Sequence, residues 1–244
     1  SVGLEWREVA VLRAYAKYFK QTGFAFSQIY IKDSLVNHPT VTRLLVDLFE
    51  LRFRPGGEHS ESSELALRTR ILERLDQVES LDEDRILRRY LDMIAGSLRT
   101  NFYQKNAQGE FKSYISFKLS PRTIPDLPKP LPMYEIFVYS PRVEGVHLRG
   151  GKVARGGLRW SDRREDFRTE VLGLVKAQQV KNAVIVPVGA KGGFFPKNLP
   201  KTANRDEILA EGIACYQTFV RGLLDITDNL VDGKVTPPVD VERK

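Results

Sequence analysis

Residues Arg155–Gly193 read RGGLRWSDRREDFRTEVLGLVKAQQVKNAVIVPVGAKGG. Apolar residues at helical spacing from Phe167 onward predict a helix, with Ser161 as its N-cap and acidic residues in its first turns. The continuously apolar run AVIVPV then predicts a buried strand over 183–188, which leads into Gly189–Gly193. A strand before the helix completes a strand–helix–strand unit. The fold class predicted from this stretch is therefore mixed α/β.

Three basic residues stand at the ends of these elements: Arg155, Lys181 and Lys191. Arg155 is followed by Gly156–Gly157 and Lys191 by Gly192–Gly193. Glycine lets the backbone approach a ligand closely, and a cation without acidic neighbours attracts a carboxylate. The combination predicts a pocket for a small dicarboxylic acid. Lys181 also has a purely structural explanation, because basic residues favour helix C-termini.

The net charge of +7 is concentrated in one segment of the chain. Between Gly151 and Lys201 there are 11 Lys and Arg and 4 Asp and Glu, whereas the remaining residues hold 27 of each sign. From Val171 to Lys201 the sequence contains no acid. A local field of this kind attracts an anion, and charge alone leaves open whether that anion is a phosphate backbone or a small carboxylate.

A nucleic-acid surface is one alternative explanation of the basic segment. Arg163, Arg164 and Arg168 with Trp160 could form a basic stripe with an aromatic stacking residue. The acids interleaved with them would repel phosphates; these are Asp162, Glu165, Asp166 and Glu170. The sequence GAKGG lacks the G-x-x-x-x-G-K-[ST] spacing of a phosphate-binding loop. The three histidines are scattered without partners at metal spacing, so no metal site is predicted.

The first part of the chain is predicted to be mostly helical, and we divide the sequence into a helical region (1–110) and an α/β portion (111–244). Apolar residues recur at helical spacing in five segments. The predicted helices span 5–18, 24–36, 39–53, 64–78 and 82–100. The polar, glycine-containing segment 54–64 is a predicted loop.

Alternating and β-branched patterns predict three strands in the second part, over 113–119, 134–139 and 143–148. The five prolines between Pro121 and Pro132 predict an extended connector. A last helix is predicted over 206–231, with Cys215 as a small core residue. One cysteine excludes an internal disulfide and fits a reducing compartment. No apolar run approaches the ~20 residues that span a bilayer.

The basic segment resembles the substrate-binding domain of the glutamate dehydrogenases and their amino-acid dehydrogenase relatives. That family carries Lys-Gly-Gly-x-Arg, a helix with an early Glu, Gln-x-x-Lys-Asn, an apolar strand ending in Pro, and Gly-x-Lys-Gly-Gly. The matching residues here are Arg155–Arg159, Glu170, Gln178–Asn182, Pro187 and Gly189–Gly193. Arg155 replaces the Lys of the small family members. Most of the chain is similar to the large, NAD-specific bacterial class.

The resemblance implies roles for individual residues. Lys191 would be the catalytic lysine, since the chemistry needs a group that takes up and returns protons beside the substrate. Gln178 and Lys181 would hold the substrate, with Lys181 near its α-carboxylate, and Arg155 and Gly156–Gly157 complete the predicted substrate-binding set. No G-x-G-x-x-G follows a strand, so NAD would be bound by a domain outside these residues, without a Rossmann domain here.

The implied reaction is the oxidative deamination of L-glutamate to 2-oxoglutarate and ammonium by a cytoplasmic homo-oligomer. We expect these residues to be a piece of a larger enzyme that ends before the catalytic Asp and the dinucleotide-binding domain and is inactive alone. Arg155, Arg159 and Lys181 are equal candidates for the γ-carboxylate. The alternatives are a polyanion-binding module without catalysis, and an interaction domain whose helical half binds a partner. Neither nucleic acid nor a membrane is an expected partner.

Overall fold

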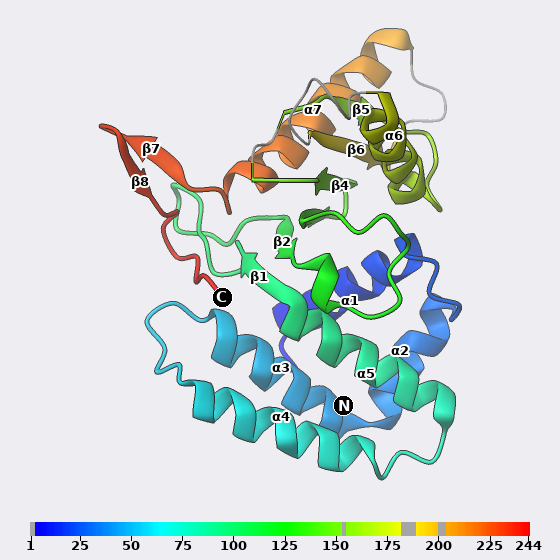
Figure 1. Cartoon of the computed structure of the whole chain (residues 1–244), viewed down its shortest axis with the longest axis vertical. Helices are drawn as coiled ribbons and strands as arrows, with labels where there is room; N and C mark the ends of the chain where they lie inside the picture. The colour runs from blue at the N-terminus through cyan, green and yellow to red at the C-terminus, as the bar shows by residue number, and fades with distance from the viewer. Residues whose placement is uncertain (1–2, 153–154, 182–188, 200–203) are drawn as a thin grey trace.

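The computed structural model describes residues 3–152, 155–181, 189–199 and 204–244, with the side chains of 179–181 outside the description. A bundle of helices at one end of the molecule leads into a mixed sheet, and two further helices pack on that sheet (Figure 1). The fold class predicted from the sequence, mixed α/β with a helical N-terminal region, is confirmed.

Five helices precede the main body of the sheet: α1 (Trp6–Gln21), α2 (Gln28–Asn37), α3 (Pro39–Phe53), α4 (Glu61–Leu75) and α5 (Leu81–Gly96). Serine side chains begin three of them, because Ser27, Ser60 and Ser80 each accept a hydrogen bond from a backbone N–H in the first turn. The predicted helix over 82–100 is wrong at its end. It stops at Gly96, and Ser97–Thr100 forms strand β1.

The large sheet has the strand order β1-β2-β3-β4-β6-β5. Its further strands are β2 (Ile115–Leu119), β3 (Tyr134–Tyr139), β4 (Val143–Arg149), β5 (Leu158–Trp160) and β6 (Ala190–Pro196). All neighbours are antiparallel except β5 and β6, which run parallel. The proline-rich connector holds one short 3-10 turn, η1 (Pro121–Thr123). The predicted strand over 183–188 lies outside the described residues.

The two faces of the sheet pack against different helices. Helix α6 (Phe167–Lys181) covers one face together with α1, and α7 (Arg205–Leu224) covers the other. A side chain at Gly193 would meet Val171 of α6, whereas one at Gly145 would meet Phe219 of α7. We call these two surfaces the α6 face and the α7 face. Cys215 is buried on α7, as the sequence predicted.

The end of the chain differs from its prediction. Helix α7 stops at Leu224 instead of continuing to 231, and a hairpin of β7 (Asn229–Val231) and β8 (Lys234–Thr236) follows. The turn residues Asp232 and Gly233 have φ of +50° and +76°. Positive φ at both central residues is the geometry that Asp-Gly favours in a two-residue hairpin turn. The hairpin projects from the body of the molecule in Figure 1.

Candidate functional site

Three segments of the predicted site meet beside the first residues of β6. The backbone oxygen of Arg155 accepts a hydrogen bond from the Ala190 N–H at 2.7 Å, and the oxygen of Gly157 accepts one from Gly192 at 3.2 Å. These bonds continue the parallel pairing of β5 with β6 toward the N-terminal end of both strands. The structure therefore brings RGG and GAKGG, which are more than thirty residues apart, into direct contact.

Helix α6 delivers Gln178 to the same place. A Cβ built on Gly189 would lie 2.3 Å from Nε2 of Gln178 and 2.7 Å from the backbone oxygen of Arg155. The amide of Gln178 thus occupies the space that any side chain at Gly189 would need. Gln178 is half-buried, so part of its amide remains accessible.

Lys191 lies on the α6 face of the sheet. Successive side chains of a strand point to opposite faces, so residues 189, 191 and 193 share one face. The missing side chains of Gly189 and Gly193 point at α6, at Gln178 and Val171 respectively. Lys191 stands between them, half-buried, opposite Leu148 of β4. Lys191 and Gln178 therefore lie on the same side of the sheet.

Gly156 is required by the packing of the protein itself. A Cβ at Gly156 would lie 1.5 Å from the backbone oxygen of Ala190, which no real contact permits. The adjacent Gly157 has no atom within 4 Å of the corresponding position. The two glycines of this pair therefore differ: the first lets β6 approach, and the second faces open space.

An ion pair joins the first strand of the unit to its helix. Glu170 of α6 bonds Nε of Arg159 at 2.8 Å and accepts a hydrogen bond from the Ser161 hydroxyl at 2.5 Å. The prediction that Ser161 caps the helix is wrong, because α6 begins at Phe167 and Ser161 instead accepts a turn bond from the Arg163 N–H. Arg159, a candidate for the γ-carboxylate, already has an acidic partner in this structure.

The start of α6 is held by a fully buried ion pair. Arg168 bonds Glu135 of β3 through two parallel contacts of 2.7 and 2.8 Å, and both side chains have an exposed fraction of 0%. Burial alone would lower the pKa of Arg168, but the adjacent Glu135 carboxylate raises it above its ordinary value. The backbone N–H of Arg168 donates to the Gln21 amide oxygen of α1 at 3.2 Å. Sequence patterns give no signal for which acid meets Arg168.

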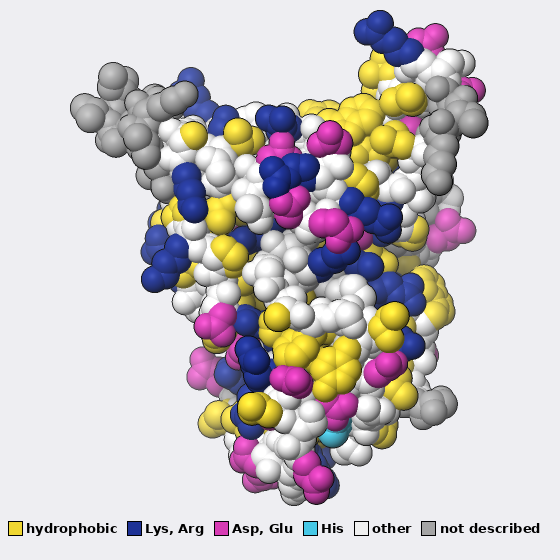
Figure 2. Space-filling view, turned by 90° about the vertical axis from the view of Figure 1, so that its right-hand side faces the viewer, with side chains coloured by type: hydrophobic (Ala, Val, Ile, Leu, Met, Phe, Trp, Pro, Cys, Tyr) yellow, Lys and Arg dark blue, Asp and Glu magenta, His cyan; other side chains and the backbone are white. Residues whose placement is uncertain are grey.

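The basic stripe considered for nucleic acid is not assembled in the structure. Arg168 is buried, Arg163 pairs with Asp166, and Trp160 packs on Phe194 at 6.2 Å between ring centroids. Figure 2 shows one face of the molecule, on which basic and acidic side chains are intermingled. The side chain of Lys181 lies outside the described residues, although the helix reaches it.

His147 of β4 lies opposite Gly192 in the register and fills part of the space that a side chain there would take. Burial, reinforced by the neighbouring Arg149 cation, lowers the pKa of His147 to about 4. Below the ordinary histidine pKa of ~6.5, the unfolded chain binds a proton at His147, whereas the folded protein does not. The contribution of His147 to stability is therefore complete at neutral pH and is lost as pH falls toward 4.

We expect the protein to lose roughly 1 kcal/mol of stability through His147 for each pH unit below that ordinary value. Denaturant unfolding of the wild type and of His147→Asn, from pH 7.5 down to 4.5, measures this. The wild-type curve should fall more steeply than that of the variant. Parallel curves would show that His147 is as free to ionise in the folded protein as in the unfolded chain.

Within residues 3–152, 155–181, 189–199 and 204–244, no three His, Cys, Asp or Glu side chains are grouped as metal ligands would be. Over the same residues, no helix has the length and apolar character needed to cross a bilayer.

Two family models match the chain. Residues 70–244 match the model described as bacterial NAD-glutamate dehydrogenase, catalytic domain, and residues 1–55 match glutamate dehydrogenase, helical motif 3. The chain is similar to the NAD-specific glutamate dehydrogenase of Halomonas elongata, with 63% identity over 98% of this chain, and to that of Mycobacterium tuberculosis, with 53% over 99%.

The relative from Pseudomonas aeruginosa is 63% identical over 100% of the chain. The chain spans only 15% of the length of this relative and of the Halomonas protein, and 16% of the mycobacterial one. The family model nevertheless covers well over half of the residues here. On this match, and on the converging motifs of β5, α6 and β6, the chain belongs to the bacterial NAD-glutamate dehydrogenase family.

Proposed function

We propose that this chain forms the substrate-binding side of an NAD-dependent glutamate dehydrogenase, which converts L-glutamate to 2-oxoglutarate and ammonium. One observation carries the proposal: Arg155–Gly157, Gln178 and Gly189–Lys191 meet at the start of β6. These are the motifs that the family resemblance assigns to substrate. In this proposal residues 111–244 supply the α/β substrate-binding portion, and 1–110 the helical region that packs on it.

Each site residue has a proposed role. Lys191, half-buried on the α6 face, takes a proton at Nζ from the water that adds to Cα of the iminium. In the reverse direction its ammonium polarises the 2-oxo group. Gln178 donates its amide to the substrate, and Lys181 takes the α-carboxylate. Arg155 is exposed beside Gly156–Gly157 and has no ion-pair partner among the described residues, so it is proposed to take the γ-carboxylate in place of Arg159, which is engaged by Glu170.

NAD is the hydride acceptor of the reaction. The sequence has no G-x-G-x-x-G between a strand and a helix, so we assign no NAD contact to these residues. In the proposal, NAD is bound by another part of the enzyme, which faces the site across the start of β6. The residues described here bind and orient the substrate and transfer protons to and from it.

Calorimetric titration with 2-oxoglutarate tests the substrate assignment. We expect saturable binding that Lys191→Met weakens by roughly tenfold or more, because a charge-assisted contact is lost. Lys176→Met is the matched control, since Lys176 is an exposed lysine of the same helix that carries Gln178. In the full-length enzyme, Lys191→Met should lower turnover of glutamate by about 10²–10⁴. Undiminished turnover in that variant would remove Lys191 from the catalytic role.

We further propose a cytoplasmic homo-oligomer. The single cysteine, buried and with its pKa raised to about 12 by burial, fits a reducing compartment. Helix α7 exposes a row of large apolar side chains, namely Ile208, Leu209, Ile213 and Tyr216. Such a row on one helix favours contact with another subunit. Sedimentation of the wild type and of Leu209→Lys checks whether this row carries the association.

A further inference from the structure

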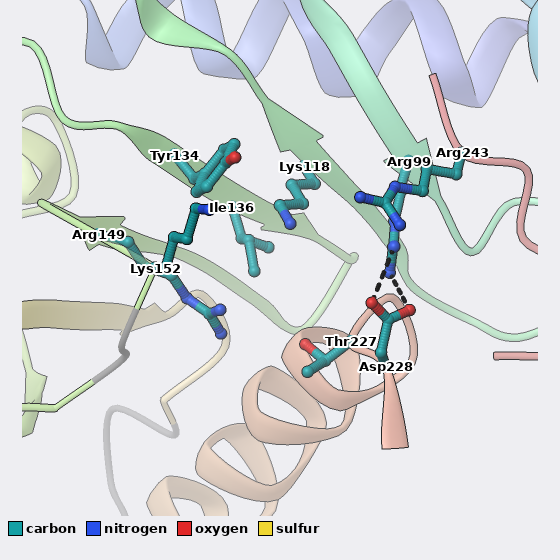
Figure 3. Close-up of a pocket in the computed structure, with 9 residues that line it drawn as sticks. All are labelled: Arg99, Lys118, Tyr134, Ile136, Arg149, Lys152, Thr227, Asp228 and Arg243. Atoms are coloured by element: carbon teal, nitrogen blue, oxygen red, sulfur yellow. Dashed lines mark hydrogen bonds and ion pairs between the residues drawn. The ribbon is translucent and has the colours of Figure 1, made fainter. Parts of the chain in front are cut away.

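A basic cavity of about 310 Å³ lies on the α7 face of the sheet, beyond the C-terminal end of α7. Five cations line it: Arg99, Lys118, Arg149, Lys152 and Arg243. Figure 3 shows Arg149 and Lys152 on one side of the cavity, Arg99 and Arg243 on the other, and Lys118 between them. We call this cavity the basic pocket. It is distinct from the candidate substrate site, because Lys191 lies on the α6 face.

The register of the sheet gathers these cations from distant parts of the sequence. Arg99 of β1 pairs directly with Lys118 of β2, and Arg149 at the end of β4 pairs with Tyr134 at the start of β3. Like charges directly opposite one another destabilise a sheet. The Arg99–Lys118 pairing therefore destabilises the folded protein. An anion close to both side chains would offset this repulsion.

One carboxylate of the protein offsets part of this positive charge. Arg99 is bonded by both oxygens of Asp228, at 2.7 and 3.1 Å. Among the residues that the structure describes, no carboxylate lies within ion-pairing distance of Lys118, Arg149, Lys152 or Arg243. Asp228 also acts on Lys118 and Arg243 from a distance, so five cations and one described carboxylate leave the cavity with a net excess of four positive charges.

Two of these cations, Lys118 and Arg149, are partly withdrawn from water, whereas Lys152 and Arg243 are exposed. Burial, with the nearby cations Arg99 and Arg149, lowers the pKa of Lys118 to about 8. Burial also lowers the pKa of Arg149. The ammonium of Lys118 lies 4.4 Å from the centroid of the Tyr134 ring. The ring favours the charged form of the lysine, but it carries no formal charge that would neutralise it. An anion bound in the cavity would stabilise the charged forms of Lys118 and Arg149.

We propose that the basic pocket binds the diphosphate group of a small phosphorylated molecule. The four cations without an ion-pair partner carry far more positive charge than the single negative charge of a carboxylate. Their total is close to the roughly three negative charges of a diphosphate. The guanidinium groups of Arg149 and Arg243 stand on opposite sides of the cavity (Figure 3), so each can take one phosphoryl group while Lys118 bridges them. A volume of about 310 Å³ admits a diphosphate with a small substituent.

Calorimetric titration with inorganic pyrophosphate at constant ionic strength tests the proposal. We expect saturable binding to the wild type, weakened roughly tenfold or more by Arg149→Met and likewise by Arg243→Met, because each removes a charged hydrogen bond. Arg70→Met is the matched control, since Arg70 is an exposed arginine of α4 and lies outside the pocket. Thermal unfolding of every variant establishes that it is folded before its binding is compared.

Further ligands distinguish the source of the diphosphate. Tighter binding of adenosine diphosphate than of pyrophosphate, with none of adenosine, would support a nucleotide; equal binding would support free diphosphate. No binding of pyrophosphate, or binding that both arginine variants leave unchanged, overturns the proposal. So does a DNA duplex that binds through these residues with a steep salt dependence while pyrophosphate does not.

One variant separates this proposal from the proposed function. Lys191→Met should leave pyrophosphate binding unchanged, because Lys191 lies on the other face of the sheet. An excess of 2-oxoglutarate should not displace pyrophosphate. Loss of pyrophosphate binding in Lys191→Met, in a folded protein, would show that the two sites are one and would overturn the assignment of a separate pocket.

Discussion

Replacing Arg168 by Met should destabilise the protein by about 3–5 kcal/mol, the cost typical of breaking a buried ion pair. The substitution leaves the Glu135 carboxylate with an exposed fraction of 0% and without its bidentate partner. A buried charge of this kind must either be neutralised by a proton or draw in water, and both are unfavourable. Guanidinium unfolding, with the midpoint and slope compared, measures the loss.

Two further variants test the cause. Arg163→Met removes an exposed arginine five residues earlier, whose partner Asp166 is also half-exposed, and should leave the unfolding midpoint nearly unchanged because water screens the pair. The double variant Glu135→Leu/Arg168→Met should recover most of the loss, because no unpaired charge remains buried. A double variant as unstable as Arg168→Met would mean that the shape of the arginine, and not its charge, is what the site requires.

Replacing Gly156 by Ala should separate β5 from β6 and abolish the response to 2-oxoglutarate. The new Cβ would lie 1.5 Å from the Ala190 oxygen, so the two backbones must move apart by more than 1 Å. Overpacking of this kind typically costs about 1–3 kcal/mol, and a contact with backbone leaves no flexible side chain to yield. The Arg155–Ala190 hydrogen bond of 2.7 Å is lost first.

Gly157→Ala provides a matched control within the same pair of glycines. Its Cβ meets no atom within 4 Å, and neither glycine has a positive φ. The same chemical change should therefore leave stability within ~0.5 kcal/mol and leave 2-oxoglutarate binding intact. Calorimetry and denaturant unfolding of both variants measure the difference. Equal effects at the two positions would mean that glycine is needed here for its flexibility and not for the contact.

Helices were predictable where capping residues and apolar spacing agree. Ser80 and the acids after it mark the start of α5, and Pro39 marks that of α3. The end of α5 was not predictable in the same way, because the apolar stripe continues into Ser97–Thr100 while tertiary pairing with β2 makes those residues a strand. The hairpin after α7 did carry a local signal. Asp232–Gly233 between short apolar runs is typical of a two-residue turn, and the helical spacing of earlier residues obscured it.

The meeting of the RGG and GAKGG motifs was predictable from order and spacing, because both lie in one continuous segment and join through backbone pairing. The basic pocket was not. Counting charge along the chain assigns the whole excess to 151–201, yet only Lys152 of its five cations falls there. The others come from β1, β2, β4 and the last residues, and only the strand register brings them together. The sequence likewise does not reveal that Glu135 pairs with Arg168, because only the packing of α6 on β3 brings the two residues together.

The anchoring of α6 has a consequence for the order of folding. Its first turn is fixed by Glu135, 33 residues away along the chain, and by Gln21, 147 residues away. Closing the longer loop costs more chain entropy, so we expect the β3 contact to form first and the α1 contact to follow. Gln178 and Gly189 can then reach their final positions only after β3 and α1 have both packed against the start of α6. The residues proposed to bind substrate are thus among the last to become ordered.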